Sequence, residues 1–422
     1  MRRQATSDSA TVGRALAIAA IGAVLIALVA THLPHLSAGP LDYDEGIYWL
    51  SLRSMRAGHP LFTSVYSSQP PAFLLVTEPP WSWLGGSIEA GRAVMLAWSA
   101  VAVAAGSVLG WRLGGRLVGV ATALLLTVDP RMVDQSITLQ ADGPAVALGL
   151  VSLAAAAVAV TIDSRRWRNV AAVVAGVAMA LGLLTKLFDV GIVPALLALL
   201  LTSRQRWALV GLAAAGGVAA AAAVLLPMAD AWQAMWTQAI GLHLSTSTRA
   251  LDQALSLSFL KQFLHSEWPV VAVAALGALI GWRHTRRLWL VGVVWVGGAM
   301  AAVAVTRPLF PHHMVLVIPG LAVLGATGFA AVVAEIGERS GRRPAVVVGG
   351  LATVAALAAA HSPASQASRP RWQPGCRCTR PSPVAPSSTP GRPVRPDRRS
   401  SGRRPWRAPP RRALPVASAR RG

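Results

Sequence analysis

The chain has 422 residues, of which 54% are hydrophobic and 13% are charged, and its mean hydropathy is +0.51. A soluble domain of this length would carry about 25% charged residues, so the composition excludes a soluble protein and predicts an all-α, polytopic membrane protein. The net charge of +22 is uneven: residues 362–422 hold 15 Arg against one Asp, whereas residues 1–361 hold 24 Lys and Arg against 16 Asp and Glu. We therefore expect the membrane as a partner and no nucleic acid.

Apolar runs of about 15 to 22 residues recur along the chain, and each is long enough to cross a hydrocarbon core of about 30 Å as a helix. We predict about eleven spans, at 15–30, 92–111, 116–128, 143–162, 169–185, 188–202, 207–227, 268–282, 288–306, 313–334 and 344–360. The runs 116–128 and 188–202 are short, so broken or re-entrant segments are the alternative for these two.

The first run follows Arg2, Arg3 and Arg14. A cleaved signal peptide and an uncleaved first span both fit this pattern, and we expect the span because the run is long for a signal sequence. Residues 33–91 then turn polar and aromatic, which is typical of helices at the membrane surface. One such helix is expected from near Asp44 through Ala57.

The charges on the connections predict the orientation. With the N-terminus in the cytoplasm, 16 basic residues fall on short inner connections, and the longer outer segments carry 12 acidic residues. The positive-inside rule favours this arrangement. It places both long segments, 33–91 and 228–267, outside the cytoplasm at the cell membrane. A transfer reaction there would need a lipid-carried donor, because nucleotide sugars are scarce outside.

The last segment, 362–422, is rich in Arg, Pro and Ser and lacks apolar periodicity. We treat 1–361 as one membrane domain and 362–422 as a separate tail. A disordered basic tail is one interpretation. A reading-frame slip in a GC-rich gene is the one we favour, because out-of-frame GC-rich codons yield this composition. Both cysteines, Cys376 and Cys378, lie in the tail, so the membrane domain has no disulfide or thiolate metal site.

Three carboxylates, Asp42, Asp44 and Glu45, follow the first span within four residues. If Asp44 opens a helix, the helix dipole favours its ionised form, which can accept a hydroxyl proton or bind a divalent cation. An acidic helix cap is the alternative. Asp142 precedes a later span and also fits an N-cap, but the topology places it on the same face as Asp44. Asp129 and Asp134 share its loop and are weaker candidates.

Several cations lie at the outer ends of the predicted spans, namely Arg92, Lys186, Arg307, His312 and His313. At this depth they are suited to binding a lipid phosphate, and anchoring at the membrane boundary is the alternative. Gln69, before Pro70 and Pro71, belongs to a rigid extended element that forms either an acceptor groove or a simple turn. The sequence has no nucleotide-binding glycine loop, no zinc-spaced ligands and no serine nucleophile elbow.

These motifs resemble, in order and spacing, the dolichyl-phosphate-mannose protein mannosyltransferase and aminoarabinose transferase superfamily, GT-C fold glycosyltransferases of family 39 and related groups. The resemblance covers about residues 14–335. It rests on Asp44-Glu45-Gly46-Ile47-Tyr48, Gln69-Pro70-Pro71, Arg92, Ala141-Asp142-Gly143-Pro144, Lys186 and Pro311-His312-His313 leading to Pro319. Two departures are Gln69, where many members have Lys, and the tail in place of the usual C-terminal region.

The resemblance implies an inverting hexosyl or pentosyl transfer from a polyprenyl-phosphate carrier to a lipid, glycan or protein acceptor. Asp44 would be the catalytic carboxylate, with Glu45 beside it and Asp142 as the second acidic position. Arg92 would match the arginine after the first loop, and Lys186, His312, His313 and Arg307 would serve the donor phosphate. Asp42, Tyr48 and Gln69 would line the acceptor side.

Divalent-metal dependence varies among such enzymes, so a divalent cation on Asp44 and Asp142 stays open as a cofactor. A lipid-linked sugar transporter is the chief alternative function, and an inactive, truncated membrane protein is a third. A transporter should hold its charged site near the bilayer midplane, so Asp44 lying far from Asp142 and Lys186 would favour transport.

Overall fold

The computed structural model describes residues 2–38, 41–241, 250–306 and 309–340, and the account below concerns these residues. They form helices and connecting turns, and the described part of the chain contains no β-strand beyond an isolated bridge between Leu61 and Val65. The all-α prediction is therefore confirmed. The predicted span 344–360 and the tail 362–422 lie outside the described residues.

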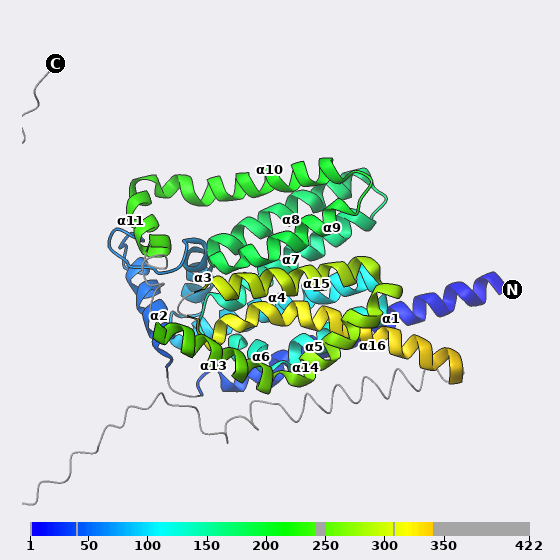
Figure 1. Ribbon diagram of the computed structural model, residues 1–422. Coiled ribbons are helices and arrows are strands. Elements are labelled where there is room, and N and C mark those ends of the chain that lie inside the picture. The colour runs from blue at the N-terminus through cyan, green and yellow to red at the C-terminus, as the bar shows by residue number, and fades with distance from the viewer. Residues whose placement is uncertain (1, 39–40, 242–249, 307–308, 341–422) are drawn as a thin grey trace, which may run out of the picture. The chain divides into compact units, whose positions relative to one another are not determined.

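The elements follow one another in the order shown in Figure 1. Their bounds are α1 (Arg2–His32), η1 (Leu33–His35), α2 (Tyr43–Arg56), α3 (Ala72–Trp83), α4 (Ile88–Gly114), α5 (Arg116–Val128), α6 (Pro130–Ser136), α7 (Asp142–Thr161), α8 (Arg165–Thr185), η2 (Leu187–Ile192), α9 (Val193–Leu201), α10 (Arg206–Leu225), η3 (Leu226–Ala231), α11 (Trp232–Trp236), η4 (Thr237–Gly241), α13 (Ala250–Ser266), α14 (Trp268–Ile280), η5 (Gly281–Arg283), α15 (Arg286–Val305), η6 (Pro311–Val317) and α16 (Ile318–Ser340).

In the part of the chain that the structure describes, seven helices are long and apolar enough to span a membrane, and the bent pair Leu257–Ser266 and Trp268–Arg283 would make an eighth. The runs predicted as short, 116–128 and 188–202, are indeed shorter apolar helices, α5 and η2 with α9. Ten of the eleven predicted runs thus coincide with helices. Fewer than eleven of the described helices, however, are long and apolar enough to count as spans. The chain is a multi-pass membrane protein.

The long helices pack closely because small residues lie at their crossings. Helix α8 packs against both α7 and α10, and α14 packs against α16. A methyl group at Gly176 would collide with the backbone of Ala213, and one at Gly277 would collide with the backbone of Leu324. In lipid, helix association depends on such close backbone approach. The Ala- and Gly-rich composition of the runs is therefore what allows this bundle to form.

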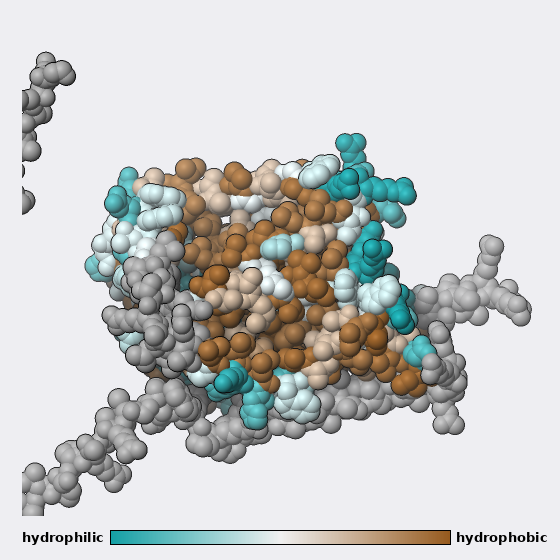
Figure 2. All heavy atoms as spheres, viewed as in Figure 1, coloured by the Kyte–Doolittle hydropathy of each residue, from teal (hydrophilic) through white to brown (hydrophobic). Residues whose placement is uncertain are grey.

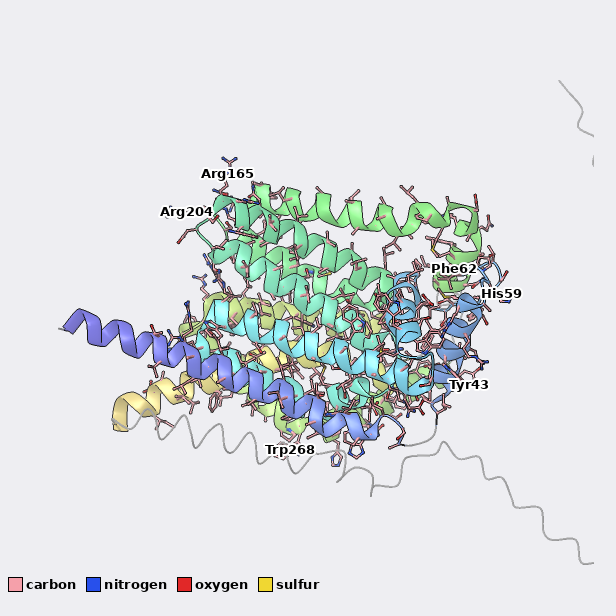
Figure 3. The ribbon with its side chains drawn as sticks, turned by 180° about the vertical axis from the view of Figure 1, so that it is seen from behind. Tyr43, His59, Phe62, Arg165, Arg204 and Trp268 are labelled. Carbon is pink, nitrogen blue, oxygen red and sulfur yellow. The ribbon has the colours of Figure 1, made fainter. Side chains whose placement is uncertain are left out.

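Polar and basic residues gather at the two ends of the bundle. Figure 2 shows a broad apolar band between two ends where hydrophilic side chains collect. Arg165 and Arg204 lie at one end, whereas Tyr43, His59 and Phe62 lie at the other (Figure 3). The second end carries α2, α3 and α11, from the two long polar segments (Figure 1). We call this end, which carries α2 and its candidate residues, the loop end.

Candidate active site

Helix α2 begins one residue earlier than predicted, and Asp42 is its N-cap rather than Asp44. The Asp42 carboxylate accepts from the Tyr43 N–H at 2.7 Å, and Glu45 Oε2 accepts from the Asp42 N–H at 3.2 Å, which completes a capping box. Gly58, at φ +90°, follows the helix. Because Asp42 takes the capping role, Asp44 lies in the first turn with its side chain available for other work.

Glu45 and Arg92 form a buried ion pair. Arg92 donates from Nη2 to Glu45 Oε2 at 2.7 Å and from Nε to Oε1 at 2.9 Å. Glu45 also accepts from the Leu139 N–H at 2.9 Å, and Arg92 Nη1 donates to the Leu36 and Ala38 carbonyls. Despite burial, these hydrogen bonds hold the pKa of Glu45 below its usual value. The pair ties the end of α1 to α2, α4 and the loop before α7.

Asp44 is the least constrained carboxylate of the three. It is half-buried, and no side-chain hydrogen bond joins it to another described residue. Burial is the main cause that raises its pKa, and the neighbouring Asp42 adds to the rise. The sequence interpretation expected the helix dipole to favour the ionised form, but desolvation outweighs it here. A carboxylate with a raised pKa is a stronger base once it is ionised.

Asp142 and Lys186 form a second buried ion pair. Lys186 Nζ donates to Asp142 Oδ2 at 2.6 Å, and both side chains are more than nine-tenths buried. Asp142 is the first residue of α7 and caps no backbone N–H, so the N-cap explanation of this residue is wrong. Lys186 follows α8 in extended backbone, and its ammonium lies 5.2 Å from the Phe188 ring centroid.

The carboxylates from the two separate segments converge. Asp44 lies close enough to both Asp142 and Lys186 for their charges to act on it. Tyr48, one turn further along α2, is buried between them: burial and then the charges of Asp44 and Asp142 raise its pKa. Gln140 Nε2 donates to Asp42 Oδ2 at 2.8 Å and so joins the loop before α7 to the N-cap of α2. The first turn of α2 and the start of α7 therefore form one charged cluster.

Gln69 joins this cluster through Tyr48. The side chains of Gln69 and Ser68 lie close enough to the Tyr48 hydroxyl to act on its pKa, and its ring packs edge-on against Phe73 at 4.9 Å between centroids. Pro70 and Pro71 lead from Gln69 into α3. Among the acceptor-side residues, Tyr48 and Gln69 are thus in contact, and Asp42 lies at the helix cap two residues before Asp44.

The two histidines are connected to Lys186 through the Phe188 ring, which both Lys186 and His313 contact. His313 is buried and packs edge-on against Phe188 at 4.6 Å between ring centroids, and His312 contacts His313 at 4.4 Å. The charges of Asp142, Lys186 and Asp42 reach His312. Both histidines precede α16 in η6. Arg307 lies outside the described residues.

The sequence analysis missed Asp189. This carboxylate is 1% exposed, its Oδ2 has no hydrogen-bond partner among the described residues, and the charges of Asp142 and Lys186 act on it. Gly149 and Gly182 make room for it, since a methyl group at Gly182 would stand 2.5 Å from Asp189 Oδ2. The available signal was an ionisable residue within the apolar run 188–202.

A second charged cluster lies near η6. Arg131 Nε lies 3.3 Å from Glu267 Oε1, and Arg131 Nη1 donates to the Pro311 carbonyl at 2.7 Å. Asp129 is buried and accepts from the Arg131 and Met132 N–H groups, and burial, with the charge of Glu267, raises its pKa to about 8. Asp134, the other weaker candidate, is exposed on α6. This cluster fixes the position of η6 and its two histidines.

The donor set does not make a ready metal site. Within the described ranges, no three His, Cys, Asp or Glu side chains come together in a way that would hold a metal ion. Asp142 Oδ2, one of the two predicted ligands, is engaged by the Lys186 ammonium. A divalent cation between Asp44 and Asp142 would have to displace Lys186, which already supplies a positive charge there.

Two comparisons with known proteins bear on this site. The family model described as dolichyl-phosphate-mannose-protein mannosyltransferase matches residues 69–230. This range includes Gln69, Arg92, Asp142 and Lys186 and begins after Asp44. No curated protein matches the chain in sequence.

The fold is similar to solved structures of membrane glycosyltransferases. ArnT from Cupriavidus metallidurans bound to undecaprenyl phosphate matches with a TM-score of 0.61 at 19% identity, over 81% of this chain and 63% of ArnT. The Archaeoglobus fulgidus oligosaccharyltransferase tethered with an acceptor peptide matches with a TM-score of 0.55 at 12% identity, over 82% of this chain and 55% of that one. The same enzyme in complex with Zn and sulfate matches with a TM-score of 0.50 at 13% identity, over 81% of this chain and 53% of that one. The chain thus spans about three-fifths of the ArnT length.

Proposed function

We propose that this chain transfers a sugar from a polyprenyl-phosphate carrier to an acceptor, because residues 69–230 match the protein mannosyltransferase family model and the fold is similar to that of ArnT. The reaction takes place at the outer face of the cytoplasmic membrane and inverts the anomeric carbon. The observation that carries the proposal is the half-buried Asp44 carboxylate, which has no side-chain hydrogen bond among the described residues and lies near the buried Asp142 and Lys186 pair.

Asp44 acts as the general base. Its position in the first turn of α2, close to the charges of Asp142 and Lys186, suits it to take the proton of an acceptor hydroxyl. The acceptor oxygen then bonds to the anomeric carbon while the bond from that carbon to the phosphate oxygen breaks. The electron pair of the broken bond leaves with the polyprenyl phosphate, and attack from the opposite face gives inversion.

Lys186 is placed to stabilise the departing phosphate, and His312 lies near it. The Lys186 ammonium is held by Asp142 over the Phe188 ring, and the charges of both partners reach His312. A cation fixed in a desolvated site stabilises developing negative charge more strongly than water does. Arg92 is a weaker candidate for this role, because Glu45 and two backbone carbonyls engage its guanidinium.

The donor and acceptor classes rest on the similar proteins. Undecaprenyl phosphate is bound in the ArnT structure, and an acceptor peptide is tethered in the oligosaccharyltransferase structure. A polyprenyl-phosphate donor and a lipid, glycan or protein acceptor follow for this chain, with either a hexose or a pentose as the sugar. The transporter alternative loses support, since Asp44 lies near the charges of Asp142 and Lys186.

The test is glycosyl transfer by membranes that contain the protein. Undecaprenyl-phosphate-linked mannose or aminoarabinose is supplied with a panel of serine- and threonine-rich peptides, extracted lipids and cell-envelope glycans, and release of undecaprenyl phosphate is measured. Asp44→Asn should lower the rate by about 10²- to 10⁴-fold, the usual contribution of a general base. Glu89→Gln, which neutralises an exposed carboxylate at the start of α4, is the matched control and should retain activity.

Wild-type membranes that release no undecaprenyl phosphate with any pair, or Asp44→Asn membranes as active as wild type, would overturn the proposal. The same assay with EDTA tests the cation. Because Lys186 engages Asp142, transfer should persist after chelation. Activity that is lost with EDTA and regained with Mg²⁺ or Mn²⁺ would assign a metal to this site.

A further inference from the structure

The side chain of Gln238 connects the two long polar segments of the loop end. Gln238 lies in the π-helical turn η4, in the segment 228–267. Its Oε1 accepts from the Ser67 N–H at 3.1 Å, and its Nε2 donates to the Phe62 carbonyl at 2.8 Å. Both ends of the amide are engaged, and only one of the two amide orientations satisfies both partners. The contact therefore requires one orientation of the amide. It joins residues more than 170 positions apart in the sequence.

The segment that Gln238 contacts adopts a backbone that needs support. Phe62 has φ +66°, in the left-handed region, although its side chain is buried with 2% exposed. Non-glycine residues pay to adopt this conformation and keep it where surrounding contacts fix it. The Phe62 N–H donates to the Val65 carbonyl at 2.7 Å, and Gln238 binds the Phe62 carbonyl. Gln238 thus holds the strained turn from outside its own segment.

A chain of neighbouring residues leads from this turn toward the charged cluster. Ser67 Oγ donates to the Gln69 carbonyl at 2.9 Å, and the Gln69 N–H donates to Ser67 Oγ at 3.2 Å. The side chains of Gln69 and Ser68 lie close enough to the Tyr48 hydroxyl to act on its pKa. Tyr48 lies four residues after Asp44, so the two share one face of α2. Gln238 is therefore connected, through residues 67–69, to the face of α2 that carries Asp44.

We propose that Gln238 is a positioning residue for the acceptor. It holds residues 62–69 against Tyr48, so that this segment forms a fixed wall beside Asp44 on which an acceptor hydroxyl is oriented. The inference rests on the proposed function. It assigns to η4 a part in acceptor binding, whereas Lys186 serves the donor phosphate.

The test compares three variants with the acceptor of the panel that the wild-type protein glycosylates. Gln238→Ala should raise the KM for that acceptor about tenfold, as expected for the loss of two hydrogen bonds, and change kcat and the KM for the undecaprenyl-phosphate-linked sugar by less than about threefold. Gln238→Glu keeps the size but cannot donate to the Phe62 carbonyl, so it should behave like Gln238→Ala. Gln233→Ala, an exposed glutamine on α11, is the control and should match wild type.

The outcomes separate this inference from the proposed function. Wild-type membranes without transfer would count against the function, whereas transfer with an unchanged acceptor KM in Gln238→Ala would overturn the inference alone. A Gln238→Glu variant with wild-type kinetics would show that only side-chain volume matters and would also overturn it. An equal rise of both KM values, together with a lower thermal midpoint, would mean general loosening of the loop end and count against it.

Discussion

At the residue scale, the site is built from two buried ion pairs and one free carboxylate. Glu45 is paired with Arg92 and Asp142 with Lys186, whereas Asp44 has no such partner among the described residues. Despite its burial, Glu45 has a lowered pKa because Arg92 hydrogen-bonds it, whereas burial raises the pKa of Asp44. This difference in partners is what distinguishes Asp44 from the acids that surround it.

The Asp142 and Lys186 pair should show strong coupling. Asp142→Asn or Lys186→Met alone should each lower stability by about 3–5 kcal/mol, because each leaves one buried charge without its partner. The double variant should recover much of that loss, since it removes both charges. Thermal melts of the detergent-purified protein provide the measurement. Additive losses in the double variant would mean that the two side chains do not depend on one another.

Asp189 should behave differently from these paired acids. Asp189→Asn keeps the shape of a buried side chain that lacks a hydrogen bond at Oδ2 among the described residues. We expect a thermal midpoint equal to or above that of wild type, because the substitution removes no hydrogen bond at that atom. Gly182→Ala, which crowds the same carboxylate, should instead lower the midpoint. A lower midpoint in Asp189→Asn would assign the carboxylate a structural role.

At the element scale, ion pairs fix the short helices of the loop end to the long ones. Glu45 and Arg92 join α2 to α4, and Arg131 with Glu267 joins α6 to the break between α13 and α14. Short helices have little stability of their own, so their placement depends on such contacts. The site residues on α2 and η6 are therefore positioned by charges far away in sequence.

The Glu45 and Arg92 pair should act as a tether more than as a catalyst. Glu45→Gln removes the charge but leaves an acceptor oxygen for the Leu139 N–H. It should lower stability by about 2–4 kcal/mol, since Arg92 stays buried without its counter-charge. Activity measured well below the melting range should fall far less than in Asp44→Asn. An equal loss of activity in both variants, at unchanged stability, would place Glu45 in the chemistry.

Asp129 gives the loop end a predictable pH dependence. Its pKa is raised to about 8 by burial and by Glu267, well above the value of about 4 in an unfolded chain. Between these pH values the folded state binds a proton that the unfolded state lacks, so stability falls as pH rises from about 4 to about 8. Asp129→Asn should flatten this decline. Thermal midpoints of both proteins at pH 5, 6, 7 and 8 measure this decline. An equal dependence of the midpoint on pH in wild type and Asp129→Asn would contradict the prediction.

At the scale of the whole molecule, the two ends of the bundle differ in charge. Arg165 and Arg204 lie at the end opposite Tyr43, His59 and Phe62, as the positive-inside rule requires if the loop end faces outward. An outward site fits a lipid-carried donor, since the polyprenyl chain stays in the bilayer while its phosphate reaches Lys186. The orientation is therefore part of the proposed chemistry and can be tested separately from it.

Labelling of single cysteines tests the orientation. After Cys376 and Cys378 are replaced with Ser, Thr63→Cys should react in intact cells with a membrane-impermeant maleimide, because Thr63 is exposed at the loop end. Ser164→Cys, exposed at the opposite end, should react only after permeabilisation. Mass tagging of the purified protein measures both. The reverse pattern would place the site in the cytoplasm and remove the basis for a lipid-carried donor.

The sequence by itself determined the membrane class, the helices and their approximate ends, because a run of apolar residues in lipid has to satisfy its own backbone hydrogen bonds as a helix. It also identified Asp44, Asp142 and Lys186 as residues worth a hypothesis, since ionisable groups are rare in such a chain. The start of α2 was predicted to within two residues, and the runs that form α5 and α9 were predicted to be short, because both features depend on neighbouring residues in the sequence.

Only the tertiary structure decided which charges are partners. The pairing of Glu45 with Arg92, the contact of Lys186 with Asp142, the glycine-lined space around Asp189 and the reach of Gln238 to Phe62 join residues that are distant in sequence. Hydrophobic periodicity reports which face of a helix is buried, but the partner of a buried charge depends on which helix crosses at that depth. That crossing is set by side-chain packing along the whole bundle.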